Sequence, residues 1–282
     1  MIVAGSLPSS LRLGPVHLTV PDLERSLEWY ERSLGLRVAE RGDRSVAVGD
    51  GAETLVVLHE DRDGRPDETG AGLFHYCLVY PSRAELGRAL ARLESTGAEL
   101  TNIRDRGTHE AIYLPDPDGN TLELAWDRPR AEWPTDPYGH EPVAIEREEL
   151  LAAGGDGDVR ASVARGMEVG HVHVTIGDLD DAVAFYHHEL GFDLMYHVGW
   201  GAFFSVGGYH HNAAANIRRG EGLPPQSDGA LGLQHWTIQL SDDEAVAETR
   251  RRFEAAGRQV ETLADGFAVR DPWQLELHVV SR

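Results

Sequence analysis

The sequence predicts an α+β protein built from four βαβββ modules that pair into two open, barrel-like domains. The first observation is a repeat, because residues 16–23 (VHLTVPDL) match residues 172–179 (VHVTIGDL). The second is that each copy alternates like a strand and then runs into a helical pattern. The third is a stretch rich in Pro, Gly and acidic residues between the two halves. We therefore expect domains at 12–128 and 166–282, joined by a linker at 129–165.

Four amphipathic helices are predicted, one in each module. Asp22 and Asp178 are expected to cap the helices of the first and third modules, because a side-chain oxygen accepts the free N–H groups of a first turn. Ser82 and Ser241 each open a Ser-x-x-Glu capping box in the second and fourth modules. The expected helices are 23–34, 82–97, 179–190 and 241–257, with β-rich segments at 46–58 and 194–217 and a short linker helix near 145–152.

The composition argues against several classes of function. A net charge of −21 disfavours nucleic acid or an anionic membrane as a partner, and no apolar run is long enough to span a bilayer. The sequence has no lysine, which excludes Schiff-base chemistry, and no Gly-x-Ser-x-Gly elbow of a serine hydrolase. Residues 1–5 lack the features of a signal peptide, and the single Cys77 is expected to be a small buried hydrophobe. We therefore expect a cytoplasmic protein.

Polar residues inside apolar strands indicate metal chemistry. Residues 170–178 (GHVHVTIGD) alternate, so that His171 and His173 point to one face of a strand and the apolar residues to the other. His235 and Glu276 interrupt two later apolar strands in the same way. A buried carboxylate needs a compensating cation or water. Two histidines and one carboxylate from three strands form a ligand set for a divalent metal with open positions.

These modules and residues resemble the vicinal oxygen chelate superfamily, which contains glyoxalase I, bleomycin-resistance proteins and extradiol dioxygenases. The two-domain length and residues 207–211 (GGYHH) are most similar to the catechol 2,3-dioxygenase branch. The resemblance implies the glyoxalase/extradiol dioxygenase fold and a metal held by His171, His235 and Glu276. In that family the first ligand lies seven positions before the aspartate that opens the helix, which is Asp178 here.

The repeat distinguishes the two neighbouring histidines of the third module. His173 has a counterpart, His17, in the first module, whereas the counterpart of His171 is Pro15, which cannot bind a metal. A residue shared by both copies is expected to belong to the common scaffold. We therefore expect His171 to be the ligand and His173 to line the site, with a chelate through both histidines as the alternative.

The first half carries an incomplete copy of the ligand set. His75 and Glu123 stand in the matching places, but Pro15 replaces the first ligand. We therefore expect the N-terminal site to hold no metal and to support the fold. A metal bound there with help from His17 is the alternative.

The resemblance also implies a cofactor and a mechanism. Fe(II), with Mn(II) as its nearest substitute, would leave sites for both oxygens of a catechol-type aromatic and for O₂. A histidine acid/base matches His211, and His210 and His278 are expected beside the substrate. A polar strand edge is the alternative role for His210 and His211. The tyrosine usual in ring-cleaving relatives is replaced by Ala268 and occurs in the first half as Tyr113.

An extradiol ring-cleavage dioxygenase is therefore the favoured function. A glyoxalase-like, metal-dependent isomerase or lyase is one alternative, and a non-catalytic drug- or aromatic-binding protein of the bleomycin-resistance type is the other. For the favoured function we expect a small aromatic substrate and O₂ as reactants, no nucleic acid or membrane partner, and a homo-oligomer.

Overall fold

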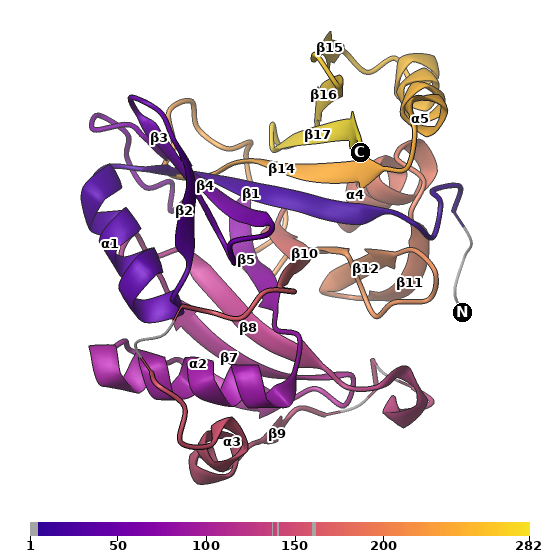
Figure 1. The fold of residues 1–282 in the computed structure, drawn as a ribbon. Coiled ribbons are helices and arrows are strands. Elements are labelled where there is room, and N and C mark those ends of the chain that lie inside the picture. Colours follow the sequence, from indigo (N-terminus) through magenta and orange to yellow (C-terminus); the bar gives the residue numbers. More distant parts are fainter. Residues whose placement is uncertain (1–4, 137, 140, 160–161) are drawn as a thin grey trace. The chain divides into compact units, whose positions relative to one another are not determined.

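The computed structural model describes residues 5–136, 138–139, 141–159 and 162–282, so the opening segment 1–4 lies outside the described residues. The protein is α+β, as the sequence predicts, with many strands and few helices (Figure 1).

Contacts divide the chain into two compact units. Unit 1 comprises the residues up to Thr19, residues 63–74 and residues 170–282, and unit 2 comprises residues 20–62 and 75–169. This division differs from the expected domains at 12–128 and 166–282. The difference arises because the first strand, β1 (Arg12–Val20), pairs with strand β14 (Gly232–Leu240) of the last module.

Unit 1 contains two ladders of strands. Besides β1 and β14, its strands are β10 (Glu168–Thr175), β11 (Asp193–Val198), β12 (Gly201–Ser205), β13 (Ala213–Asn216), β15 (Val260–Thr262), β16 (Gly266–Arg270) and β17 (Glu276–Ser281). In the first ladder β1 is antiparallel to β14, β14 is parallel to β17, and β16 and β15 follow antiparallel. In the second, β10 is parallel to β13, and β12 and β11 follow antiparallel.

Unit 2 also contains two ladders, of which the second repeats the pattern of unit 1. Its strands are β2 (Arg37–Arg41), β3 (Ser45–Gly49), β4 (Thr54–Glu60), β5 (Gly72–Val79), β6 (Asn102–Asp105), β7 (His109–Pro115), β8 (Thr121–Asp127) and β9 (Val143–Ala144). Strands β2, β3 and β4 form an antiparallel meander. Strand β5 is parallel to β8, and β7, β6 and β9 follow antiparallel.

Two helices form where the sequence predicts them. These are α1 (Leu23–Leu34) and α2 (Arg83–Thr96). The Asp22 carboxylate accepts a first-turn N–H of α1 at 3.1 Å, and the Ser82 hydroxyl accepts one of α2 at 3.2 Å. Both predicted N-caps are therefore confirmed.

The other two helices differ from the prediction in detail. The helix of the third module begins as α4 (Leu179–Val183) and continues as a π-helix, η2 (Ala184–Glu189). Helix α5 (Asp243–Ala255) is capped by Asp242 and not by Ser241. The Asp242 carboxylate accepts a first-turn N–H at 2.9 Å, and the Ser241 hydroxyl donates to that carboxylate. A carboxylate at this place also complements the helix dipole, which a hydroxyl does not.

The linker is more structured than expected. It contains a 3₁₀ turn, η1 (Arg130–Glu132), and helix α3 (Arg147–Gly154), which confirms the expected short helix. Strand β9, which the sequence does not indicate, pairs with β6. Helix α3 crosses α2 at Gly87, where an added Cβ would lie 2.3 Å from the carbonyl oxygen of Leu150. The two helices approach this closely because Gly87 has no side chain.

Each unit uses one buried tyrosine–aspartate hydrogen bond to hold its last hairpin. The Tyr30 hydroxyl donates to Asp116 at 3.0 Å in unit 2, and the Tyr186 hydroxyl donates to Asp271 at 2.9 Å in unit 1. Burial raises the pKa of both aspartates to about 6. Each aspartate opens the turn into the strand that carries a candidate carboxylate ligand, so this bond fixes where that strand begins.

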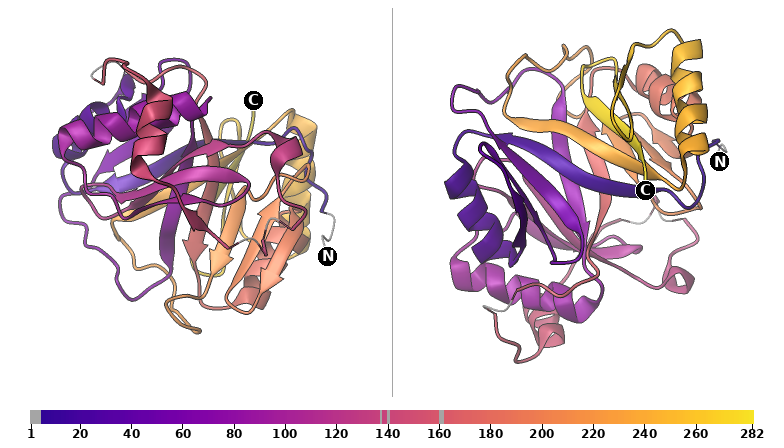
Figure 2. Two further views of the ribbon diagram at one scale, coloured as in Figure 1. Left: turned by 90° about the horizontal axis from the view of Figure 1, so that it is seen from below. Right: turned by 45° about the horizontal axis from the view of Figure 1, so that its top comes forward.

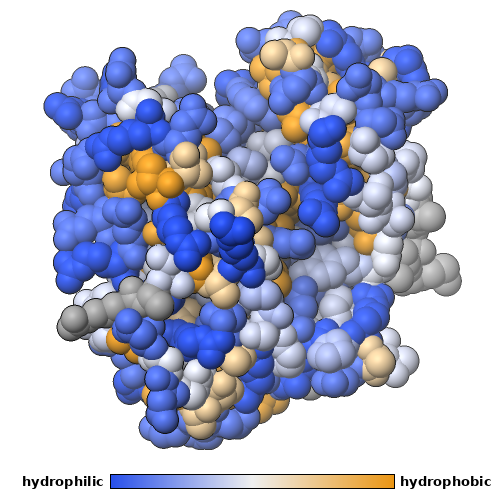
Figure 3. Space-filling view, viewed as in Figure 1, coloured by the Kyte–Doolittle hydropathy of each residue, from blue (hydrophilic) through white to orange (hydrophobic). Residues whose placement is uncertain are grey.

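The outer surface agrees with the composition. Helix α5 packs on strands β14, β16 and β17, as the further views show (Figure 2). The face drawn in Figure 3 is mostly hydrophilic, in keeping with a net charge of −21. In the described parts of the chain, none of the helices is long and apolar enough to cross a membrane.

Candidate metal centre

A cluster of histidines in unit 1 gathers three of the residues that the sequence singles out. His171 on β10 is fully buried, and its ring lies 4.1 Å from the ring of His211. The Nδ1 atoms of His210 and His211 are 2.9 Å apart. One ring nitrogen from each of the three lies within 4.8 Å of the others, which is close enough to share a metal. The cluster is therefore a dense set of nitrogen donors.

His173 lies beside this cluster with one nitrogen already engaged. Its Nε2 is 3.0 Å from the side-chain amide nitrogen of Asn216, which can only donate. Its ring is 6.5 Å from that of His211 and 4.8 Å from that of Phe74. An Nε2 that accepts this hydrogen bond is not available to a metal, so His173 could bind one only through Nδ1. Its role as a lining residue stays a prediction.

A second group in unit 1 contains the other two expected ligands. His235 is paired with Glu276 across the β14–β17 ladder, and ligand atoms of His235, Glu276 and His278 lie within 4.8 Å of one another. The Glu276 carboxylate is 2.8 Å from His278 and forms an ion pair with Arg270. The hydrogen bond from His278, with the charge of Arg270, lowers the pKa of Glu276.

The expected ligand set is thus divided between two groups. His171 lies with His210 and His211, whereas Glu276 and its paired histidine lie with His278. His17, the alternative ligand of the first half, stacks on His235 with ring centroids 3.8 Å apart. His17 lies beside His235 because β1 pairs with β14 and these two residues are opposite each other in the ladder.

Unit 2 contains a buried carboxylate between two imidazoles. Glu123 on β8 is 1% exposed. One of its oxygens lies 3.1 Å from Nε2 of His75, and the other lies 2.7 Å from Nε2 of His109. A carboxylate is buried in this way only when cations or hydrogen bonds compensate its charge. Imidazole and carboxylate together suit first-row divalent metals, so these donors fit such an ion.

Tyr113 stands directly opposite Glu123 in the β7–β8 ladder. Its ring lies 6.0 Å from that of His75, and its hydroxyl accepts a hydrogen bond from Arg106 at 3.1 Å. Burial, together with the charge of Glu123, raises the pKa of Tyr113 well above its ordinary value. The hydroxyl therefore remains protonated at neutral pH. The counterpart of Ala268 in unit 2 is therefore a tyrosine, and it lies beside the Glu123 carboxylate.

The register of the last hairpins corrects one equivalence drawn from the sequence. Tyr113 pairs with Glu123 in unit 2, and the corresponding Ala268 pairs with His278 in unit 1. His278, and not Glu276, therefore stands in the place of Glu123.

The parallel strand pairs β5–β8 and β14–β17 also make His278 the counterpart of Glu123. Cys77, two residues after His75, pairs with Glu123, and Thr237, two residues after His235, pairs with His278. Glu276 is displaced because the turn before it is two residues shorter. Five positions separate Glu276 from Asp271, whereas seven separate Glu123 from Asp116.

Two of the residues around Glu123 in unit 2 are not among the candidates drawn from the sequence. His109 and Arg106 flank the β6–β7 turn, where no repeat partner draws attention to them. His109 could be found by counting back from Tyr113 in steps of two, because residues at that spacing share a face of a strand. The expectation for Cys77 is confirmed, since it is 1% exposed and burial raises the pKa of its thiol.

Comparison with known families shows which superfamily the chain belongs to. The model of the Glyoxalase/Bleomycin resistance protein/Dioxygenase superfamily matches residues 12–124 and 168–277. The chain belongs to this superfamily. It is also 36% identical over 275 residues to the catechol-2,3-dioxygenase of Bacillus subtilis (strain 168), covering 95% of this chain and 96% of that protein.

Solved structures show the same superfamily fold at low sequence identity. A dioxygenase-like protein of Bacillus subtilis subsp. subtilis str. 168 matches with a TM-score of 0.69 and 15% identity, covering 98% of this chain and 86% of that chain. Glyoxalase I from Zea mays matches with a TM-score of 0.60 and 16% identity, covering 96% and 92%. The neighbours therefore include members with different reactions, and the choice among them depends on the site.

Proposed function

We propose that this superfamily member is an extradiol ring-cleavage dioxygenase that acts on a catechol-type aromatic with O₂ and Fe(II). We further propose that His75 and Glu123 of unit 2 are ligands of the metal, in place of His235 and Glu276. The observation that carries this proposal is the pairing of Tyr113 with Glu123, because a tyrosine beside the metal carboxylate is the feature that the fourth module lacks. The 36% identity to a catechol-2,3-dioxygenase supports the same reaction.

The donor set favours Fe(II), with Mn(II) as its nearest substitute. A divalent ion held there would supply positive charge that lowers the pKa of a coordinated hydroxyl, and open positions for two substrate oxygens and O₂. The chain itself supplies orientation. The Tyr113 hydroxyl accepts a hydrogen bond from Arg106 and is also hydrogen-bonded to Glu123. With a metal bound to that carboxylate, the hydroxyl could donate to an oxygen of the substrate instead.

His211 is proposed as the acid/base group. Ring cleavage of a catechol requires that a proton leave the second hydroxyl and that one be returned, and an imidazole titrates in the required range. His210 contacts His211 through the two Nδ1 atoms, so one ring orients the other. No lysine exists to take this role.

The first ligand, His171, remains a separate prediction. The argument from Pro15 and from the spacing to Asp178 does not depend on which carboxylate binds the metal. Substitution of His171 by alanine should therefore reduce bound metal.

Matched variants of the two repeat copies test the proposal. Protein purified anaerobically with Fe(II) should hold about one ion per chain and consume O₂ when catechol is added. Glu123→Gln should lose the metal and the O₂ uptake, whereas Glu276→Gln should keep the metal. A wild-type protein that binds a divalent ion but consumes no O₂ with any catechol would refute the dioxygenase and favour the isomerase. Tight binding of an aromatic without metal would favour a binding protein.

A further inference from the structure

We infer that Thr108 and His109 form a relay that positions the Glu123 carboxylate for metal binding. This inference rests on the proposed function, because it assigns Glu123 to the metal. His109 is neither a repeat partner of a candidate ligand nor a residue that the reaction needs. Its place in the structure is nevertheless highly constrained, since it is 5% exposed and contacts a polar group at each end of its ring.

The hydrogen bonds fix the direction of this relay. His109 Nε2 lies 2.7 Å from Oε1 of Glu123, and His109 Nδ1 lies 2.8 Å from the hydroxyl of Thr108. An ionised carboxylate can only accept, so Nε2 must carry the proton and donate it. In the neutral ring Nδ1 then accepts from the Thr108 hydroxyl. The threonine thereby selects the tautomer whose N–H points at Glu123.

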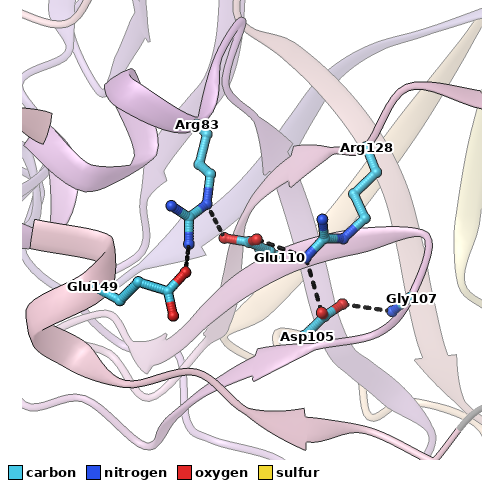
Figure 4. A network of polar contacts seen from close by, with 6 residues as sticks. All are labelled: Arg83, Asp105, Gly107, Glu110, Arg128 and Glu149. Atoms are coloured by element: carbon cyan, nitrogen blue, oxygen red, sulfur yellow. Dashed lines mark hydrogen bonds and ion pairs between the residues drawn. The ribbon is translucent and has the colours of Figure 1, made fainter. Parts of the chain in front are cut away.

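The turn that carries the relay is anchored from its opposite face. Successive residues of β7 point to opposite faces, so Glu110 lies behind His109. Arg83 and Arg128 both donate to the buried Glu110, each at 2.7 Å, and Arg128 also bonds Asp105 at 2.8 Å (Figure 4). Figure 4 shows Glu110 between Arg83 and Arg128, with Asp105 on the other side of the Arg128 guanidinium. The turn is thus held in place while His109 faces the carboxylate.

The consequence is a defined division of the two carboxylate oxygens. Oε1 of Glu123 accepts from the His109 N–H, and Oε2 lies 3.1 Å from Nε2 of His75. Tyr113 is hydrogen-bonded to the same carboxylate. A glutamate carboxylate with one oxygen in a hydrogen bond is restrained from rotating about its Cγ–Cδ bond. Hydrogen-bond partners of metal ligands act in this way, and their loss costs about 10- to 100-fold in metal affinity or activity. His109 is therefore a positioning residue and not a catalytic one.

The test measures metal affinity in the full chain. The dissociation constant of Mn(II), and the visible spectrum of the Co(II)-loaded protein, are compared for the wild type, Thr108→Val, His109→Leu and His109→Gln. We expect His109→Leu to weaken Mn(II) binding by about 10- to 100-fold and to shift the Co(II) spectrum. His109→Gln should recover much of the affinity, because its amide can donate to the same oxygen. Thr108→Val should fall between the two. His187→Gln is the control, as His187 is buried in unit 1, where its Nδ1 is hydrogen-bonded to the Phe192 carbonyl.

The outcomes separate this inference from the proposed function. If His109→Leu binds Mn(II) within about twofold of the wild type, or if His109→Gln is as impaired as His109→Leu, the relay does not position Glu123. If Glu123→Gln itself retains the metal, the proposed site is wrong whatever His109 does. Should the leucine variant fail to fold, Thr108→Val decides the question, because it keeps the shape of the side chain and removes only the hydroxyl.

Discussion

Replacement of Asp271 by asparagine should stabilise the protein at neutral pH and not at acid pH. Oδ1 of Asp271 accepts backbone N–H groups of Trp273 and Leu275 at 2.8 and 3.0 Å, and Oδ2 accepts from Tyr186 at 2.9 Å. An asparagine oxygen can keep both backbone bonds. Its amide can donate to the tyrosine oxygen, which can accept as well as donate. The substitution therefore removes a charge, while the Tyr186 proton loses its acceptor at a cost in free energy that does not depend on pH.

The magnitude follows from the pKa of Asp271, which burial raises to about 6. An unfolded aspartate has a pKa of about 3.9, so the folded state holds this proton more tightly. The stability contributed by the group is fully present below about pH 4 and is lost as the pH rises through about 6. Linkage gives a loss of about 1.5 kcal/mol at pH 5 and about 3 kcal/mol at pH 7.5. The asparagine variant escapes this loss.

Urea unfolding of the metal-free protein at pH 5 and pH 7.5 measures the effect. The advantage of Asp271→Asn over the wild type should grow by about 1.4 kcal/mol between the two pH values. Asp116→Asn is the matched control, since its pKa is also about 6 but its Oδ2 accepts from both Tyr30 and Asn120. An amide there faces a second donor, so its gain should be smaller. An advantage of Asp271→Asn that does not change with pH would refute the reasoning.

Three further predictions concern the reaction and the packing. His211→Gln should keep the metal and lower kcat by roughly 10²- to 10⁴-fold, as the pH profile of kcat loses one limb; a wild-type rate would exclude His211 as the acid/base. Tyr113→Phe should lower kcat more than it changes the Mn(II) dissociation constant, and the reverse order would argue against a hydrogen bond to substrate. Gly87→Ala should lower the free energy of unfolding by about 1–3 kcal/mol, because its Cβ would lie 2.3 Å from the Leu150 carbonyl; thermal melting checks this.

Local features of the fold were predictable from the sequence because they depend on neighbouring residues. The caps at Asp22 and Ser82 and the helix near 145–152 follow from side-chain hydrogen bonding and periodicity over a few residues. The grouping of His171 with His211 is also consistent with the sequence, which places both in one module. The membership of β1 in unit 1 was not predictable in this way, because it depends on pairing between residues more than 200 positions apart.

The choice of carboxylate was the least accessible feature of the candidate site. Both copies present an apolar–Glu–apolar pattern, Leu122-Glu123-Leu124 and Leu275-Glu276-Leu277, so the two glutamates appear equivalent. Their burial also looks alike from the sequence. Only the ladder distinguishes them, since Glu276 faces Arg270 across its hairpin whereas Glu123 faces Tyr113.

The period of a strand explains why the shorter turn leaves no trace in the hydrophobic pattern. Removing two residues slides a strand by two positions, or about 7 Å, and returns every side chain to its original face. The buried pattern and the fold therefore survive, while the residue opposite position 268 changes from a carboxylate to His278. Counting residues across the hairpin reveals the displacement of Glu276. Ten positions separate Tyr113 from Glu123, and ten separate Ala268 from His278, but only eight separate Ala268 from Glu276. In a repeated strand, the distance from the turn identifies equivalent residues more reliably than their apolar flanks.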